Sequence, residues 1–239
     1  ANAYGWFEER EAAIWVLLEE QNSGRFYWTI PYIFVDNGYA MAAGREVYGF
    51  PKAYGRIQMP AEPALASFFG AETLVIDQHS QDTQGVYRPI LTARLSAPGN
   101  AAVPKMRDSL MDLATAAGDV LRQDSALGID WQTCQNIWAF LSDLFQRQAP
   151  MVFLKQFRDA AQPDKACYQA VVTTDTKLTG FHGGRLLSGT YTARIPDYAS
   201  HPIRRDLGFA SETITASLAF YVNIDFRLER GNVLWSAGG

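Results

Sequence analysis

The sequence predicts an α+β fold, in which a mostly antiparallel β-sheet or open barrel carries a packed pair of helices, and three observations lead to this class. In the first part of the chain and again after residue 150, apolar side chains alternate with polar ones or gather in β-branched and aromatic runs, which is typical of strands. Between these regions, residues 104–148 carry apolar side chains at three- and four-residue spacing, which is typical of helices. Neither an internal repeat nor a low-complexity linker divides the 239 residues, so residues 1–239 are expected to form a single domain.

The first strands are expected at residues 14–18 and 26–35, joined by a polar turn that contains Asn22-Ser23-Gly24. Pro31 within the second strand demands an edge position or a bulge, because proline cannot donate a ladder hydrogen bond. The sequence Asp36-Asn37-Gly38 predicts a turn after this strand. Shorter strands are expected to follow at residues 56–59, 73–77 and 90–95.

The helical pair is expected at residues 104–123 and 130–148. Pro104 suits the first turn of the first helix, and Asp130 is a suitable N-cap for the second. Strands return at 151–157 and 167–174. In the last predicted strand, from Leu218 to Leu228, every second residue is apolar, which predicts a strand with one apolar face.

The composition narrows the classes of partner. Hydrophobic residues make up 48% of the chain, charged residues 19%, and the net charge is -4, so no nucleic-acid partner is expected. No apolar run approaches the roughly 18 residues that a membrane span needs, so no membrane partner is expected. The two cysteines are too far apart in sequence for a disulfide framework, which favours free thiols in a reducing compartment and a cytoplasmic location. Two cysteines, Cys134 and Cys167, and three histidines far apart in sequence offer little for a metal site, and none is expected.

The segment that offers a candidate catalytic residue is 44–52, with the sequence Gly-Arg-Glu-Val-Tyr-Gly-Phe-Pro-Lys. Pro51 fixes its own φ and biases Phe50 towards an extended backbone, so Lys52 is expected to project from a stiff position between Phe50 and Tyr54. Desolvation beside aromatic rings disfavours an ammonium ion and lowers a lysine pKa from about 10.4 towards neutrality. A neutral amine can attack a ketone carbonyl. The alternative from the residues alone is an ordinary surface lysine.

This segment resembles the active-site motif of the acetoacetate decarboxylase family. The shared pattern is Gly-Arg-Glu, two variable residues, a small residue, an aromatic residue and then Pro-Lys, and the Asp36-Asn37 turn ahead of it matches the family in kind. In that family the lysine of the Pro-Lys pair forms a Schiff base with the substrate. The resemblance therefore implies that Lys52 is catalytic.

A second similarity lies near the start of the chain. Phe7-Glu8-Glu9 ahead of residues 13–16 is similar to a family segment in which an aromatic residue, any residue and a glutamate precede a strand. In the family that glutamate lies in the pocket near the lysine, so the resemblance implies that Glu9 is the second catalytic residue. The alternative is a solvated charge cluster from Glu8 to Glu11. The substrate-binding walls are expected to be aromatic, from Phe7, Trp28, Phe50 and Tyr54.

The resemblance covers about residues 5–60 and 150–230, and residues 104–148 look like a helical insertion. Ala53 stands where the acetoacetate decarboxylases carry a second lysine, whose charge helps to depress the pKa of the first, so the actual substrate is left open. The family also carries an arginine and an acidic residue upstream of the glutamate. Their absence from this chain predicts a missing N-terminal part, supplied by a separate segment or chain. The family commonly assembles into homo-oligomers, and the same is expected here.

Three functions follow as alternatives. The resemblance implies a carboxy-lyase, a Schiff-base-forming enzyme that decarboxylates a small β-oxo acid such as acetoacetate through a lysine iminium and needs no cofactor. The second is a pyruvate aldolase-dehydratase of the same superfamily, which would use the same lysine. The third is a non-catalytic binding module for a small apolar acid, in which Lys52 is an ordinary salt-bridge residue.

Overall fold

The computed structural model describes residues 8–62, 65–97, 105–123, 149–216 and 218–238. Its strands are β1 (Glu11–Glu19), β2 (Phe26–Val35), β3 (Lys52–Gln58), β4 (Phe68–Val75), β5 (Val86–Ala97), β6 (Ala149–Arg158), β7 (Ala166–Leu186), β8 (Thr190–Arg194), β9 (Thr213–Thr215), β10 (Phe220–Leu228) and β11 (Asn232–Ala237). Its helices are α1 (Gly38–Val47), α2 (Leu110–Gln123) and the short α4 (Ile203–Asp206).

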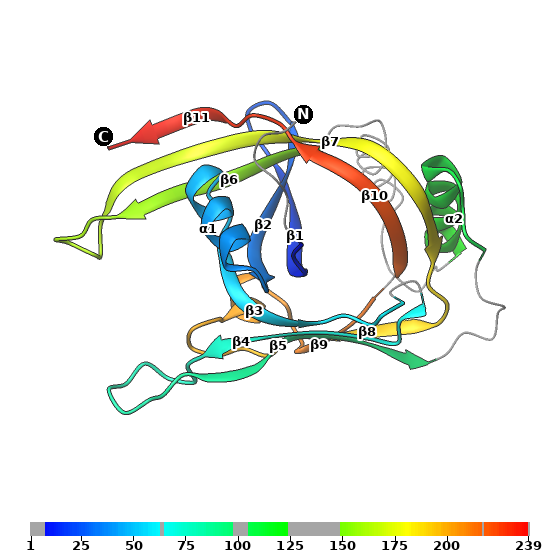
Figure 1. The fold of residues 1–239 in the computed structure, drawn as a ribbon, viewed down its shortest axis with the longest axis horizontal. Helices are drawn as coiled ribbons and strands as arrows, with labels where there is room; N and C mark the ends of the chain where they lie inside the picture. Colours follow the sequence, from blue (N-terminus) through cyan, green and yellow to red (C-terminus); the bar gives the residue numbers. More distant parts are fainter. Residues whose placement is uncertain (1–7, 63–64, 98–104, 124–148, 217, 239) are drawn as a thin grey trace.

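Within these ranges the strands form one curled sheet. The order is β10-β7-β6-β2-β3-β4-β5-β8-β9, with β1 paired to β2 and β11 paired to β7. In Figure 1 the long strands β7 and β10 arch over one side of the molecule, β3, β4, β5 and β8 form the opposite layer, and α1 and β1 lie between them. The described strand pairs are antiparallel, apart from those of β2 with β3 and with β6.

The predicted fold class, an α+β fold built on a mostly antiparallel open sheet, is confirmed. Of the predicted helical pair, the first helix is α2, which begins at Leu110 and packs against β7 on the outside of the arch. The second helix, predicted at 130–148, lies outside the described residues. The single domain over 1–239 and the status of 104–148 as an insertion stay predictions.

Pro31 lies at a bulge, as its missing N–H requires. The register of β1 against β2 shifts between Ile14, which faces Tyr32, and Val16, which faces Thr29. Trp15 on β1 is therefore opposite two residues of β2, Ile30 and Pro31, so the chain keeps its pairing without a hydrogen bond from the proline.

β2 is buried on both sides, which explains its almost continuous apolar run. Ile33 and Val35 pack into one core cluster with Phe50, Met151 and Phe153. Phe34, between them in sequence, points into a second cluster whose other buried members are Ala71, Val75, Ile90, Ile195 and Ile203. Because neighbouring strand residues face opposite sides, β2 separates the two cores.

A turn was predicted at Asp36-Asn37-Gly38, but the chain instead begins the helix α1 at Gly38. Asn37 is the N-cap, and its side-chain oxygen accepts hydrogen bonds from the N–H groups of Tyr39, at 2.9 Å, and Ala40, at 3.3 Å. A helix at this point also explains why β2 and β3 run parallel, since parallel neighbours need a crossover connection.

Gly49 ends the crossover and directs the chain into β3. Its φ of 86° is left-handed, and the N–H groups of Gly49 and Phe50 both donate to the Gly44 carbonyl at 3.2 Å. A Cβ at Gly49 would lie 2.6 Å from the Cα of Lys155 in the neighbouring β6. Both the conformation and the space at this position therefore require glycine.

The last long strand, β10, pairs with an irregular partner. The register of β10 against β7 shifts between Asn223 and Ile224 and again between Asp225 and Phe226, because β7 carries one extra residue at each place, His182 and Thr179. On β10 itself, Phe226 and Leu228 of the predicted apolar face line one cavity, although Phe220 and Phe226 stay 51% and 59% exposed.

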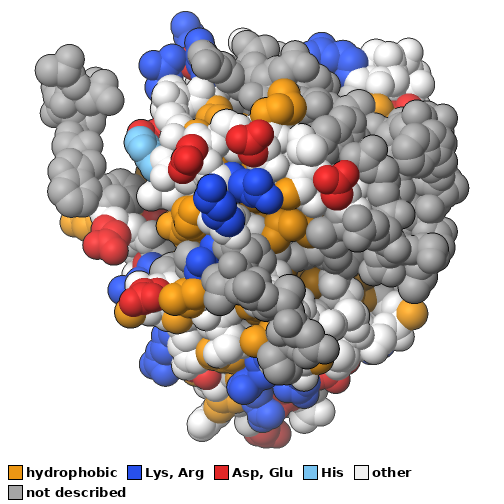
Figure 2. Space-filling model, turned by 90° about the vertical axis from the view of Figure 1, so that its right-hand side faces the viewer, with side chains coloured by type: hydrophobic (Ala, Val, Ile, Leu, Met, Phe, Trp, Pro, Cys, Tyr) orange, Lys and Arg blue, Asp and Glu red, His pale blue; other side chains and the backbone are white. Residues whose placement is uncertain are grey.

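One face of the molecule carries side chains of mixed character. On the face shown in Figure 2, basic and acidic side chains are interspersed among scattered hydrophobic ones in the coloured part of the molecule. None of the helices in the described ranges has the length and apolar character needed to cross a bilayer.

Gly49→Ala is expected to lower the free energy of unfolding by about 2 kcal/mol or more. A left-handed backbone costs a residue with a Cβ roughly 1–2 kcal/mol, and the contact with Lys155 adds to this. Gly38→Ala is the matched control, since no atom lies within 4 Å of a Cβ added at this first residue of α1. Urea denaturation of both variants measures the difference, and equal stabilities would contradict the role given to Gly49.

A second expected outcome concerns His201, whose pKa is lowered by burial. Its Nδ1 lies 2.9 Å from the Ser200 hydroxyl, and its ring lies beside Phe34 with centroids 5.9 Å apart. Because the folded pKa is below the ordinary value near 6.5, neutral His201 contributes stability that is complete above that value and is lost as the pH falls through the folded pKa.

The free energy of unfolding should therefore fall between about pH 7 and pH 5 more steeply in the wild type than in His201→Gln. His79→Gln, at an exposed histidine, is the control and should keep the wild-type slope. Denaturant unfolding at several pH values measures the slopes, and an unchanged slope in His201→Gln would rule out this role.

Candidate active site

Lys52 is the first residue of β3 and is buried, with 8% of its surface exposed. Other residues of the motif hold the Lys52 backbone through hydrogen bonds to its carbonyl and from its N–H group. The Arg45 guanidinium donates to the Lys52 carbonyl at 3.1 Å, and the Lys52 N–H donates to the Phe50 carbonyl at 2.8 Å. Gly44 leaves room for the lysine stem, because a Cβ there would lie 2.8 Å from the Lys52 Cδ. Arg45 is thus a structural residue of the site.

Two carboxylates lie against the lysine amine. Lys52 Nζ donates to both oxygens of Glu9, at 3.1 and 3.3 Å, and lies 3.5 Å from Oε2 of Glu11. Glu9 and Glu11 are two residues apart at the start of β1, where extended backbone places alternate side chains on one side. The amine therefore lies in an ion-pair cluster with two acids.

The segment that carries the acids is tied to the N-terminal end of α1. The Asn37 amide donates to the Glu8 carbonyl at 3.0 Å, and the Asp36 carboxylate accepts from the Arg10 N–H at 2.8 Å. The Asp36 N–H donates in turn to the Arg10 carbonyl at 3.2 Å. The Asp36-Asn37 pair thus caps the helix and also places the acids opposite the lysine that follows it.

The two acids differ in their surroundings. Burial raises the pKa of Glu11; the Lys52 cation acts against this, and the negative charge of Glu9 adds to it. The pKa of Glu11 is consequently above that of an ordinary glutamate, although its carboxyl lies beside a cation.

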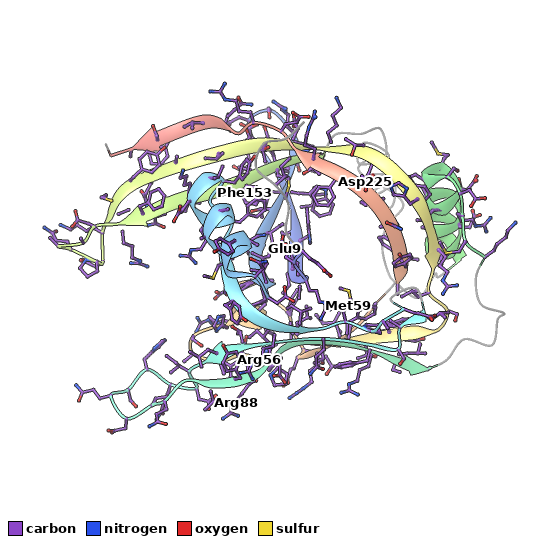
Figure 3. The ribbon with its side chains drawn as sticks, viewed as in Figure 1. Glu9, Arg56, Met59, Arg88, Phe153 and Asp225 are labelled. Carbon is purple, nitrogen blue, oxygen red and sulfur yellow. The ribbon has the colours of Figure 1, made fainter. Side chains whose placement is uncertain are left out.

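The cluster opens into a pocket with largely apolar walls. The cavity has a volume of about 260 Å³ and is formed by α1 and β3 together with residues of β1, β2, β6, β7 and β10. Besides the three charged residues, its lining consists of Trp15, Ile30, Ala40, Ala43, Gly44, Val47, Tyr48, Phe50, Met151, Thr176, Phe226 and Leu228. Figure 3 shows Glu9 near the middle of the molecule, inside the arch, whereas Arg56 and Arg88 lie at the outer side of the opposite layer.

The structure brings together three of the residues predicted for the site: Lys52, Glu9 and Phe50. Trp28 is not among the lining residues of the pocket and packs edge-to-face on Trp15, which is, with ring centroids 6.0 Å apart. Tyr54 is 47% exposed and is not among the lining residues of the described part of the chain. Phe7 lies outside the described residues.

Sequence reasoning missed Glu11 as a member of the site, and also Trp15, Thr176 and Phe226. A signal existed for Glu11, since an acid two residues after Glu9 at the start of a strand falls on the same face. Phe226 could not be found in this way, because it reaches the pocket only through the pairing of β10 with β7, far along the chain from Lys52.

Comparison with known proteins agrees with this geometry. The family model described as acetoacetate decarboxylase matches residues 3–79, which include Glu9 and the whole segment from Gly44 to Lys52. No curated protein matches the chain in sequence.

Two solved structures of acetoacetate decarboxylases share the fold. Acetoacetate decarboxylase from Legionella pneumophila subsp. pneumophila str. Philadelphia 1 is similar with a TM-score of 0.57 at 16% identity, over 98% of this chain and 69% of that chain. A structure from structural studies of acetoacetate decarboxylase gives 0.51 at 14% identity, over 95% and 68%. The enduracididine biosynthesis enzyme MppR, complexed with pyruvate, gives 0.48 at 16% identity, over 95% and 66%.

The fold is similar to that of solved acetoacetate decarboxylases, and the lysine-centred pocket includes residues of the part that the family model matches. The resemblance to the acetoacetate decarboxylase family, predicted from the sequence, is confirmed by the match over residues 3–79 and by the shared fold.

Lys52→Met is expected to destabilise the protein by about 2 kcal/mol near pH 7, because it leaves two partly buried carboxylates without their cation. The loss should be smaller near pH 5. Glu11 has a raised folded-state pKa, so its stabilising contribution is present at low pH and lost as the pH rises through that pKa. Without Lys52, the positive charge that lowers the pKa of Glu11 is gone, so the free energy of unfolding depends more strongly on pH.

Lys155→Met is the control, because Lys155 lies over the Phe157 ring at 5.3 Å. Its stability should differ from the wild type by a similar amount at both pH values. A loss in Lys52→Met that is the same near pH 5 and pH 7 would contradict the coupling between Lys52 and Glu11. Denaturant unfolding at the two pH values gives all the required free energies.

Proposed function

We propose that this protein is a Schiff-base-forming lyase that decarboxylates a small β-oxo acid, with Lys52 as the nucleophile. The observation that carries the proposal is the Lys52 amine itself, buried at the wall of a largely apolar pocket with carboxylates at 3.1 and 3.5 Å. A primary amine in a largely apolar pocket is the group that condenses with a ketone, and the adjacent acids can take and return protons.

The reaction begins when a neighbouring carboxylate removes a proton from the lysine ammonium group. The free amine adds to the ketone carbon of the substrate, and water leaves to give an iminium. The bond between the α-carbon and the substrate carboxylate then breaks, its electron pair forms the carbon–carbon double bond of an enamine, and the iminium nitrogen takes up the displaced pair. Carbon dioxide departs, and the lysine nitrogen serves as the electron sink.

The pocket favours this step by its charge and its walls. A substrate carboxylate near Glu9 and Glu11 meets two like charges beside largely apolar walls, whereas carbon dioxide is neutral. The starting anion is therefore disfavoured relative to the product. Protonation of the enamine carbon and hydrolysis of the iminium then release the ketone and return Lys52.

The departure at Ala53 does not alter the wall of the pocket. Ala53 packs against the second core cluster, beside Phe34 and away from the pocket, because consecutive residues of β3 face opposite sides. The side chain that differs from the acetoacetate decarboxylases thus lies outside the wall that meets the substrate.

Borohydride trapping followed by mass spectrometry tests the proposal. With acetoacetate, a reduced adduct is expected on Lys52, and its mass should lack the carboxyl group if decarboxylation precedes reduction. Lys52→Ala should give no adduct, whereas Lys155→Ala should be modified as the wild type is. Circular dichroism on each variant shows that loss of the adduct is not loss of the fold.

Pyruvate belongs in the same panel. An adduct with pyruvate that retains its carboxyl group, with none from acetoacetate, would favour the aldolase-dehydratase. No adduct on folded wild-type protein with either acid would overturn the lyase and leave the binding module. The homo-oligomer, the cytoplasmic location and a separate N-terminal segment stay predictions of the family resemblance.

A further inference from the structure

We propose that Glu11 is the general acid of this site, the group that delivers a proton to the enamine carbon after carbon dioxide has left, while Glu9 holds the lysine nitrogen. This division of roles rests on the proposed function, and it begins from the different ways in which the two acids meet Lys52.

Glu9 is placed to orient the nitrogen. It accepts from Lys52 Nζ with both oxygens, at 3.1 and 3.3 Å, whereas Glu11 approaches with Oε2 alone at 3.5 Å. An ammonium group has three N–H donors, but an iminium made from it has one. When the Schiff base forms, the closer and doubly bound acid keeps the remaining N–H, and Glu11 is released from the nitrogen.

Glu11 stays within reach of the carbon that needs the proton. In the enamine this carbon is two bonds from the nitrogen, roughly 2.4 Å away by ordinary bond lengths. An oxygen that stands 3.5 Å from the nitrogen can approach that carbon by a rotation of the glutamate side chain. The reacting carbon lies in the cavity, and Glu11 is among the residues of its wall.

The loss of positive charge on the lysine nitrogen during the reaction favours protonation of Glu11. Burial and the charge of Glu9 raise the pKa of Glu11, and the lysine cation opposes them. Loss of carbon dioxide converts the cationic iminium into a neutral enamine, which removes that opposition while burial and Glu9 remain. Glu11 then takes up a proton from solvent at the stage when the carbon requires one.

The step balances. The double-bond electrons of the enamine form a new bond to the proton of the Glu11 carboxyl, Glu11 becomes a carboxylate, and the nitrogen returns to an iminium. Water hydrolyses this iminium to the ketone and the lysine ammonium. The cycle consumes one proton from solvent for each β-oxo acid, and no oxidant or metal takes part.

Solvent exchange isolates this step from the formation of the Schiff base. A simple ketone such as acetone, incubated in deuterium oxide, forms the same iminium and enamine, and each return of a proton places deuterium on its α-carbon. Proton NMR measures the rate of exchange, and borohydride trapping of acetone on the same sample measures how much imine forms.

Glu11→Gln is expected to slow the exchange at least about 100-fold, the lower range for loss of a general acid, while the trapped adduct stays within about threefold of the wild type. Glu11→Asp keeps a carboxyl group and should retain more exchange than Glu11→Gln. Glu8→Gln, at an exposed acid outside the pocket lining, is the matched control and should change neither measurement.

Three results would overturn the assignment. Exchange at the wild-type rate in Glu11→Gln would show that another group supplies the proton. An equal loss of adduct and exchange would make Glu11 a positioning residue for Lys52. No adduct on the wild-type protein would remove the proposed function and the assignment of Glu11 with it, whereas in the first two cases the wild-type adduct keeps the lyase in place.

Discussion

The contact of the Lys52 amine with Glu9 and Glu11 is the interaction on which the rest of the site depends. An amine that is 8% exposed would be unfavourable without compensating charge, and two carboxylates close together would be unfavourable without the amine. The cluster therefore allows charged groups to remain inside an otherwise apolar wall. Its negative excess, two acids to one base, sets the electrostatics that any substrate meets.

The fold supplies the geometry for this cluster through the parallel unit β2–α1–β3. Asn37 starts the helix and holds the acid-bearing segment, and Gly49 ends the helix and turns the chain towards Lys52. Gly44, between them, lets the lysine stem pass close to the helix. Most residues of the motif thus serve to shape the backbone and leave room for the lysine stem. Within the motif, Lys52 alone places an amine in the pocket.

Several features followed from the sequence for physical reasons that act over short distances. The polar turn and aromatic run gave the β1–β2 hairpin, the missing N–H of Pro31 required the bulge, and the spacing of apolar residues located α2. Lys52 and Glu9 were identified through resemblance to a family, and the structure places their side chains 3.1 Å apart. The helix α1 was missed because Asn37 and Gly38 serve equally as turn residues and as the start of a helix.

The sequence by itself determined the class of fold, the stiff backbone around Lys52 and the presence of acids at the start of the first strand, because each of these depends on neighbours along the chain. Only the tertiary structure decided that Glu11 joins Glu9 at the amine, that Trp15 rather than Trp28 lines the pocket, and that Phe226 reaches the pocket from the far end of the chain. These features depend on the curl of the sheet and on bulges in β2 and β7, where the pairing with the neighbouring strand shifts by one residue. Such shifts are fixed by packing between distant segments, which no local pattern records.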